Sequence, residues 1–320
     1  MAATLGLADR AGQTGATAES LARQTGASAS VLRRLLDHLV TVGVFDRDVE
    51  TGRYRVTDFG RGLRDDDPGG LRADLDITGW LGRAELAFVE LLHTVRTGEL
   101  GYSRRYGRGF WADLAATPQL RKSFDAKMNR RFEVQATQIA QRFDWGRFSH
   151  IVDVGGGDGT LLDRILRTHP KVRGSVLDVP TTAAAATERF AEAGWGERAD
   201  AVAGSFFEPL PGGADAYVLS DILHDWDDDN ARAILTECTR AAAAHGLVLV
   251  IEVLREGLPG QGFNTAIDLS MVVFFGGRER TIEEITALAG DCGLELRDTR
   301  RVADERTLLE FGIAEPREKT

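Results

Sequence analysis

The spacing of hydrophobic residues changes at about residue 148. From there on, short apolar runs alternate with stretches of helical spacing, such as 159–170 and 229–245. The apolar runs are 150–156, 174–180, 200–206, 216–223 and 247–254. This alternation predicts an α/β domain in which a mainly parallel sheet is covered by helices on both faces. Residues 294–314 have the pattern of two strands joined by a turn, so we expect an antiparallel pair to close the sheet.

A second pattern covers residues 14–59, where leucines recur at helical spacing on both sides of Gly26. Alternating residues around the sequence ETGR then predict a hairpin. Helix, helix and hairpin make a winged-helix arrangement, which could bind DNA or serve as a structural or dimerisation domain. A DNA-reading helix needs basic residues without matching acids. The arginines here stand near acids, which favours dimerisation: Arg33, Arg34, Asp37, Asp46, Asp48 and Glu50.

Residues 68–147 have long stripes of helical spacing, interrupted by the aromatic, glycine-rich stretch 101–115. These helices could cover a pocket, pack against a second subunit or form a plain helical core. We therefore expect three parts: a winged-helix-like dimerisation domain at 1–67, a helical pocket-covering segment at 68–147 and the sheet domain at 148–320.

Composition narrows the possible partners. The 320 residues carry a net charge of −10, which argues against broad affinity for nucleic acid or anionic membranes. The two cysteines, Cys238 and Cys292, have no partner at metal-ligand spacing, so we expect buried thiols, no metal and a reducing cytoplasm. No apolar run approaches the ~18 residues of a membrane span, and no signal peptide is recognisable.

A glycine-rich loop follows the first strand of the sheet domain. In VDVGGGDGTLL, Gly155, Gly157 and Gly159 come after Asp153 and before a helix. Glycines allow a tight turn and a close approach of a ligand to the backbone. The loop differs from the dinucleotide-binding pattern, because an acid ends the strand and the third glycine comes one residue early. A carboxylate here suits a ligand that bears an ammonium or sulfonium group, as S-adenosylmethionine does.

The ends of the next two strands supply further candidates. Asp178 lies 23 residues after Gly155, where an acid can accept hydrogen bonds from ribose hydroxyls. It could instead cap the helix that follows. Ser205 can bond an adenine edge and Phe206 can flank its face, although Phe206 could also be a core residue, as we expect Phe207 to be.

Together these motifs resemble the S-adenosylmethionine-dependent O-methyltransferases of the plant caffeate and bacterial polyketide type. The resemblance covers nearly the whole chain and includes VDVGGGDG, LDVP, GSFFEPLP, LHDWDD and GGRERT. It implies a Rossmann-like class I methyltransferase sheet with an antiparallel terminal strand pair, and a winged-helix N-terminal domain through which two chains form a homodimer. It also implies S-adenosylmethionine as cofactor and a small aromatic phenolic substrate, such as a polyketide in antibiotic biosynthesis.

The resemblance assigns roles to individual residues. His224 would be the general base, with Glu279 and Glu252 beside it. Glu279 could instead cap a helix or pair with Arg278 or Arg280, and Glu252 could be an exposed acid at a strand end. By its position, Asp225 could cap the following helix. The cofactor would be held by Gly155, Asp178, Ser205, Phe206 and Ser220, to which the residue chemistry adds Asp153, Gly157 and, next to adenine or as an anchor of its turn, Trp226. Plant members often have Asp and Lys where this chain has Ser205 and Ser220. Plausible pocket walls are Asp268, Met271 and Phe275.

The expected mechanism is in-line methyl transfer to a phenol that His224 deprotonates. A phenol has a pKa of about 10, so a nearby base increases its nucleophilicity at neutral pH. His224 stands just past a strand end, where α/β proteins hold their ligands. Two alternatives remain: decarboxylation or hydroxylation on the same fold, and a ligand-sensing winged-helix regulator.

Overall fold

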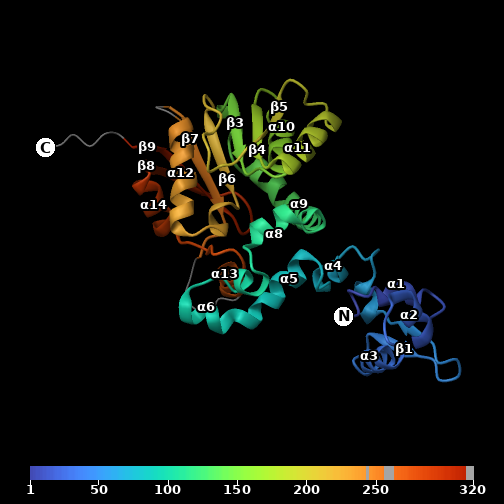
Figure 1. Ribbon diagram of the computed structural model, residues 1–320. Helices are drawn as coiled ribbons and strands as arrows, with labels where there is room; N and C mark the ends of the chain where they lie inside the picture. Colours follow the sequence, from blue (N-terminus) through green and yellow to red (C-terminus); the bar gives the residue numbers. More distant parts are fainter. Residues whose placement is uncertain (243–244, 256–262, 315–320) are drawn as a thin grey trace. The chain divides into compact units, whose positions relative to one another are not determined.

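The computed structural model describes residues 1–242, 245–255 and 263–314 (Figure 1). The chain forms two compact units, residues 1–89 and 90–320, which are described separately. The boundaries expected after residues 67 and 147 stay predictions.

The N-terminal unit has the predicted order of helix, helix and hairpin. Its helices and strands are α1 (Leu7–Ala11), α2 (Ala18–Thr25), α3 (Ala29–Thr41), β1 (Phe45–Arg47), β2 (Tyr54–Val56), η1 (Phe59–Leu63), α4 (Leu71–Leu75), α5 (Trp80–Leu86) and η2 (Ala87–Glu90), the last of which ends at the first residue of the second unit. Leu21, Leu36 and Tyr54 are fully buried in one core, and the Tyr54 hydroxyl donates to Asp37 Oδ1 at 2.6 Å. The helical spacing of 14–59 therefore marks a core-facing stripe, as expected.

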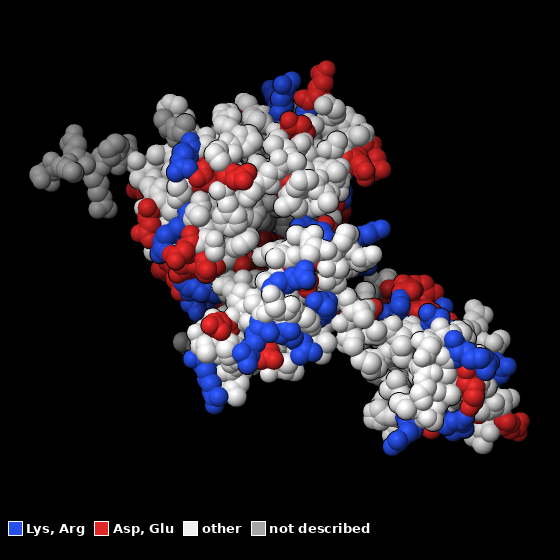
Figure 2. Space-filling view, in the orientation of Figure 1, with Lys and Arg blue, Asp and Glu red and all other residues white. Residues whose placement is uncertain are grey.

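Some arginines of this unit are paired with acids. Arg33 contacts Glu19, and Arg47 Nη1 lies 3.4 Å from Asp37 Oδ1. Figure 2 shows basic and acidic side chains next to one another on the visible face of this unit. Such pairing reduces the positive surface potential that a protein needs to bind the phosphate backbone of a nucleic acid.

The second unit contains a seven-stranded sheet in the order β5-β4-β3-β6-β7-β9-β8. Its strands are β3 (His150–Val154), β4 (Arg173–Asp178), β5 (Ala199–Ala203), β6 (Ala216–Ser220), β7 (Leu247–Glu252), β8 (Leu294–Arg301) and β9 (Thr307–Ile313). The first five run parallel, and β9 is antiparallel to both β7 and β8. The predicted antiparallel closure of the sheet is confirmed.

Helices cover both faces of the sheet, as Figure 1 shows. One face packs on α9 (Pro118–Arg142), α10 (Thr160–Thr168) and α11 (Pro180–Glu192), and the other on α12 (Asp228–Ala242) and α14 (Ile282–Asp291). Successive residues of β6 point to opposite faces: Val218 lies in the core with α9, α10 and α11, and Leu219 lies in the core with α12 and α14. A central strand buried on both faces explains the continuous apolar run 216–219.

The remaining helices of this unit gather beside the sheet. They are α6 (Leu91–Thr97), α7 (Gly101–Tyr106), α8 (Phe110–Ala116), η3 (Trp145–Arg147), η4 (Leu223–Asp225) and α13 (Phe263–Phe274). Contacts join α13 to α6 and α7, and α8 to α9. Within the described ranges, no helix is both long and apolar enough to span a bilayer.

The strand order places a switch point between β3 and β6. From β3 the chain continues to β4 on one side, whereas from β6 it continues to β7 on the other. The two connections diverge at the carboxyl ends of these strands, which leaves a crevice for ligands. The glycine loop follows β3 and His224 follows β6, so both predicted motifs lie at this position.

Candidate active site

The glycine loop after β3 has a backbone that only glycine adopts easily. Gly155, Gly157 and Gly159 have φ angles of 72°, 62° and 77°. A Cβ atom on Gly155 would lie 2.5 Å from Ile222 Cδ1, so the loop also packs tightly against the segment that follows β6. The loop therefore brings the backbone close to the switch point without side chains that would block a ligand.

Asp153 lies at the base of this loop. Its side chain is buried, and Oδ2 has no hydrogen-bond partner among the described residues. Burial, together with the negative charge of Asp178, raises the pKa of Asp153 to about 7. A buried acceptor without a donor costs free energy unless a ligand satisfies it, and a cationic ligand would do so best.

Asp178 ends β4 and faces the loop. Its Oδ2 accepts the Gly157 N–H at 3.0 Å, and its Oδ1 accepts the Val179 N–H at 2.7 Å. The helix α11 begins without a side-chain cap, so the structure does not support the alternative that Asp178 is a cap. Burial raises the pKa of Asp178, and Arg121 of α9, 3.7 Å away, opposes this effect.

The third strand end adds aromatic side chains. The Phe206 ring is half-buried and lies 5.8 Å from the Trp226 ring, edge to face. The Ser205 hydroxyl accepts the Phe207 N–H at 3.2 Å. Phe207 was expected in the core, and this is wrong: 36% of its surface is exposed. Its ring packs against those of Phe206 and Trp226, with centroids 5.0 and 4.8 Å away.

At the end of β6, Ser220 and His224 lie on the same short segment. The Ser220 hydroxyl is buried and has no hydrogen-bond partner in the described part of the chain. His224 sits in the turn η4, where Nδ1 lies 3.3 Å from Glu279 Oε1 and 3.8 Å from Glu252 Oε2. An N–H on Nδ1 can thus donate to Glu279, which leaves Nε2 as the nitrogen able to accept a proton.

The carboxylates around His224 set its protonation. Burial lowers the pKa of His224, but Glu252, Asp225 and Glu279 more than offset this and hold it well above the usual value. Burial raises the pKa of Glu252 and brings that of Asp225 to about 6. The imidazole and its neighbours form one cluster whose protons are shared.

Glu252 also holds the turn in place. Its Oε1 accepts the N–H groups of Ile222 and Leu223 at 3.2 and 2.8 Å. The side chain is almost completely buried, so the alternative of an exposed acid at a strand end is wrong. Sequence alone did not indicate this burial, because the contact joins two strands whose ends are far apart in the chain.

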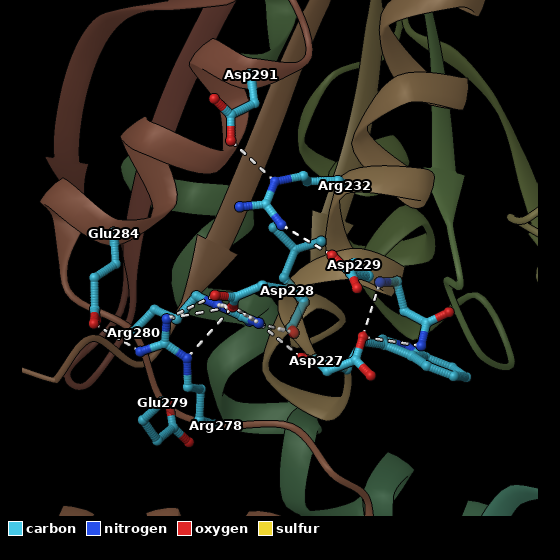
Figure 3. A network of polar contacts seen from close by, with 12 residues as sticks. Asp227, Asp228, Asp229, Arg232, Arg278, Glu279, Arg280, Glu284 and Asp291 are labelled. Atoms are coloured by element: carbon cyan, nitrogen blue, oxygen red, sulfur yellow. Dashed lines mark hydrogen bonds and ion pairs between the residues drawn. The ribbon is translucent and has the colours of Figure 1, made fainter.

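Arg280 fixes the same turn from the other side. Its guanidinium is buried and donates to the carbonyls of Leu223 and Trp226 at 2.6 and 2.7 Å. Figure 3 shows Arg278 and Arg280 converging on Asp228, at the start of α12. The arginines next to Glu279 are thus committed to other acids, while Glu279 faces His224.

The helix cap predicted at Asp225 is also wrong. The first turn of α12 is capped by Asp227, whose Oδ1 accepts the N–H of Asn230 at 2.9 Å. Asp225 lies two residues too early for this contact, and its carboxylate is 3.6 Å from His224 Nε2. It therefore belongs to the charge cluster.

The predicted pocket walls come from α13 and the segment after it. Asp268 accepts the Glu279 N–H at 2.8 Å, which ties α13 to the carboxylate beside His224. Met271 is half-buried, and its carbonyl accepts the Phe275 N–H at 2.9 Å. Phe275 stacks on Trp111 of α8, with ring centroids 5.5 Å apart.

Trp111 is a site residue that sequence analysis missed. Its ring lies nearly parallel to those of Trp226 and Phe275, at interplanar angles of 18° and 24°. We call these three rings the aromatic wall. Trp226 and Phe275 also line a cavity of about 730 Å³, together with Arg104, Asp227 and Asn230. A cavity of this volume lies within the range of small-molecule sites.

A second group that was missed lies on α9. Asn129 Oδ1 is the nearest atom to a Cβ built on Gly157, at 3.8 Å, and Arg121 stands beside Asp178. The helical stripe of 118–142 indicated a covering helix but not which polar residues it would place near the loop. The sequence GFW at 109–111 was the one available signal for the aromatic wall.

The residues of the site fit a cationic adenosyl ligand. Within the residues that the structure describes, Asp153 and Ser220 have buried side-chain oxygens without a hydrogen-bond partner, and the space beside Gly157 is open except for Asn129 Oδ1, 3.8 Å from a Cβ built there. In the described ranges, no group of three or more His, Cys, Asp or Glu side chains could hold a metal ion. The fold and this site define a class I methyltransferase.

Comparisons with known proteins agree with the assignment to the class I methyltransferases. A family model of the O-methyltransferase domain matches residues 88–295, and one of the O-methyltransferase dimerisation domain matches residues 1–64. The 2,7-dihydroxy-5-methyl-1-naphthoate 7-O-methyltransferase of Streptomyces carzinostaticus is 47% identical over 297 residues, which cover 93% of this chain and 88% of that protein. Aclacinomycin 10-hydroxylase RdmB of Streptomyces purpurascens is 40% identical and covers 98% of this chain and 85% of its own length.

A solved structure is similar over nearly the full length. The O-methyltransferase NcsB1 from neocarzinostatin biosynthesis, crystallised with S-adenosylmethionine and 2-hydroxy-5-methyl naphthoic acid, matches with a TM-score of 0.87 and 46% identity. The match covers 98% of this chain and 94% of that one. The chain therefore belongs to the O-methyltransferase family and uses S-adenosylmethionine as its cofactor.

Proposed function

We propose that this O-methyltransferase methylates a phenolic hydroxyl of an aromatic secondary metabolite, with His224 as general base. The observation that carries the proposal is the position of His224 at the switch point, with Nδ1 facing Glu279 and Glu252. A carboxylate on Nδ1 orients the imidazole and stabilises the imidazolium that forms. Nε2 is then available to accept the proton of an acceptor hydroxyl.

The aromatic wall supports the substrate class. The rings of Trp226 and Phe275 are each nearly parallel to that of Trp111, and such flat rings suit the stacking of a fused aromatic system. The relative from S. carzinostaticus is named for a dihydroxylated naphthoate, and NcsB1 was crystallised with a naphthoic acid. We infer a bicyclic or larger phenolic acceptor, such as an aromatic polyketide.

The cofactor residues keep their predicted roles in this proposal. When bound, S-adenosylmethionine supplies a methyl group on a sulfonium centre. Asp153 would face a cationic part of the ligand, and Asp178 would accept from ribose hydroxyls. The other residues would line the adenosyl and methionyl parts: Gly155, Gly157, Ser205, Phe206, Ser220 and Trp226. By fixing donor and acceptor in line, these groups supply the positioning on which methyl transfer depends.

The state of His224 gives the reaction a pH dependence. Because the carboxylates around it raise its pKa, the imidazole of His224 keeps its proton to higher pH than an ordinary histidine does. A protonated imidazole cannot act as a base, so we expect the rate to rise with pH through an apparent pKa above 6.5.

A homodimer formed through the N-terminal unit completes the proposal. The dimerisation-domain match to residues 1–64 supports it, and the paired arginines of that unit favour it over binding to nucleic acid.

The proposal is tested with two linked experiments on the full chain. Calorimetric titration with S-adenosylhomocysteine should give binding in the wild type and a loss of at least about tenfold in Asp178→Ala, which loses the contact proposed for the ribose. Methyl-labelled S-adenosylmethionine is then incubated with hydroxynaphthoic acids and other phenols. Label in an O-methyl product is expected for the wild type. Tight cofactor binding without labelled product from any phenol would contradict the proposed substrate class.

Hydroxylation is a second candidate function, because one relative is named for it. Aclacinomycin 10-hydroxylase RdmB shares 40% identity over nearly the whole chain, so this fold also occurs in a protein named for hydroxylation. The products separate the two functions by mass spectrometry, because methylation adds one CH₂ and hydroxylation adds one oxygen atom. A buried His224 flanked by carboxylates favours methylation.

A further inference from the structure

Asp221 has an unusual backbone at the start of the segment that carries His224. Its φ angle is 54°, and it is the one non-glycine residue in the described chain with a positive φ. The left-handed region costs an L-residue roughly 1–2 kcal/mol, and Asp tolerates it better than most. Its N–H donates to the Ile251 carbonyl at 2.9 Å, so the bend begins directly from the sheet.

The Asp221 carboxylate is held by an arginine from a distant part of the chain. Arg306 Nε donates to both carboxylate oxygens at 3.1 and 3.0 Å, and Nη2 donates to Oδ2 at 2.7 Å. Arg306 is 5% exposed, and its guanidinium lies 5.5 Å from the centre of the Phe132 ring of α9. A fork of this kind fixes the geometry as well as the charge of the pair.

The backbone of Arg306 is held in place by hydrogen bonds. Its carbonyl accepts the N–H groups of Val302 and Ala303 at 3.0 and 3.2 Å, which closes the tight turn between β8 and β9. The next residue, Thr307, pairs across the sheet with Glu252. The same strand pair therefore carries two side chains that hold the His224 turn: Glu252 binds its N–H groups, and Arg306 binds Asp221.

We propose that the Asp221–Arg306 ion pair is a positioning device, which fixes the turn carrying His224 and balances the charge of the acids around it. The inference rests on the proposed role of His224 as base. Neither side chain needs to touch substrate or cofactor for this role. The pair acts on His224 by fixing the backbone of residues 221–225 and by its electrostatic field.

The charged groups around His224 come from five segments of the fold. They are Asp221 and Asp225 after β6, Asp228 at the start of α12, Glu252 at the end of β7, Arg278, Glu279 and Arg280 before α14, and Glu305 and Arg306 between β8 and β9. Asp221 raises the pKa of both Asp225 and Glu252, and Glu252 in turn raises that of Arg306. Removing one member of the pair should therefore change how tightly the whole cluster holds its protons.

The test is the pH profile of kcat for variants of the pair. Arg306→Met removes a positive charge, so the rising limb should move to higher pH by roughly half a unit or more. Asp221→Gly keeps the backbone conformation but removes a negative charge, so the limb should move to lower pH. In the double variant the limb should return toward its wild-type position while kcat stays about tenfold low, because the turn is no longer fixed.

Arg306→Lys is the conservative control, and it serves if Arg306→Met does not fold. It keeps the charge but loses the fork, so the limb should stay at the wild-type pH while kcat falls severalfold. Binding of S-adenosylhomocysteine by each Arg306 variant shows that the cofactor site is intact.

The outcomes separate the two proposals. Profiles that coincide with the wild type in all variants, with only Tm lowered, would overturn the positioning role. A rising limb that persists in His224→Gln would instead refute the general-base role on which the inference rests.

Discussion

Gly157 allows the proposed cofactor cradle to be tested apart from protein stability. Its φ is 62°, and an added Cβ would meet only Asn129 Oδ1, at 3.8 Å. The methyl group of Gly157→Ala therefore extends into open space beside the loop, where we propose that the cofactor lies. Gly194, after α11, is the matched control: its φ is 74° and a Cβ there would meet nothing within 4 Å.

The two substitutions should cost the same stability. Each places an alanine in the left-handed region, which costs roughly 1–2 kcal/mol. In a unit of this size, each kcal/mol lowers Tm by about 2–4 °C, so both variants should melt a few degrees below the wild type. Cofactor affinity should differ: Gly157→Ala should bind S-adenosylhomocysteine at least about tenfold more weakly, a loss of ~1.4 kcal/mol, and Gly194→Ala should bind normally.

Differential scanning fluorimetry and calorimetric titration measure the two quantities on the same preparations. Equal affinity in Gly157→Ala and Gly194→Ala would refute the placement of the ligand against this loop. A much larger fall of Tm in Gly157→Ala than in Gly194→Ala would show that Gly157 has a packing role that its open surroundings do not predict.

Three further predictions concern charge, the aromatic wall and assembly. Because folding raises the pKa of Asp153 from 3.8 to about 7, its contribution to stability is present below the unfolded value and lost as pH rises through the folded value. Tm should therefore fall between about pH 4 and pH 7, and less so in Asp153→Asn. Trp111→Leu should lower kcat/KM for the aromatic acceptor about tenfold and leave S-adenosylhomocysteine binding unchanged, because it removes a ring of the aromatic wall. Trp111→Phe should have an intermediate kcat/KM. An equal loss of kcat/KM and of S-adenosylhomocysteine affinity would mean that Trp111 supports the fold instead. Light scattering should give twice the chain mass, and a monomer at micromolar concentration would contradict the dimer.

Local patterns predicted much of the fold. The alternation of strands and helices after residue 148 gave the parallel sheet, because buried strands and amphipathic helices differ in apolar period. The two apolar runs within 294–314 predicted the antiparallel pair, because a short turn between two strands can join them only in antiparallel order. The glycine loop and Asp178 were recognisable because a strand end, a tight turn and a helix start follow one another in the sequence.

Contacts between distant segments could not be predicted in this way. Arg306 and Asp221 are 85 residues apart, and neither has a local pattern that marks it. Phe207 has the hydrophobicity of a core residue, but it follows the end of β5 and remains partly exposed. Asp225 has the residue type of a helix cap, but the helix begins later, at Asp228. Each outcome depends on which elements meet in space, and local sequence patterns do not show that.

His224 is proposed to remove the proton of an aromatic hydroxyl during methyl transfer. The most direct test of this claim is a single-turnover measurement at saturating acceptor and S-adenosylmethionine, comparing the wild type with His224→Gln. General-base catalysis predicts a rate about 10²–10⁴-fold lower in the variant, with unchanged affinity for S-adenosylhomocysteine. A variant that transfers the methyl group within about twofold of the wild-type rate would contradict the claim, and methyl transfer would then depend on positioning alone.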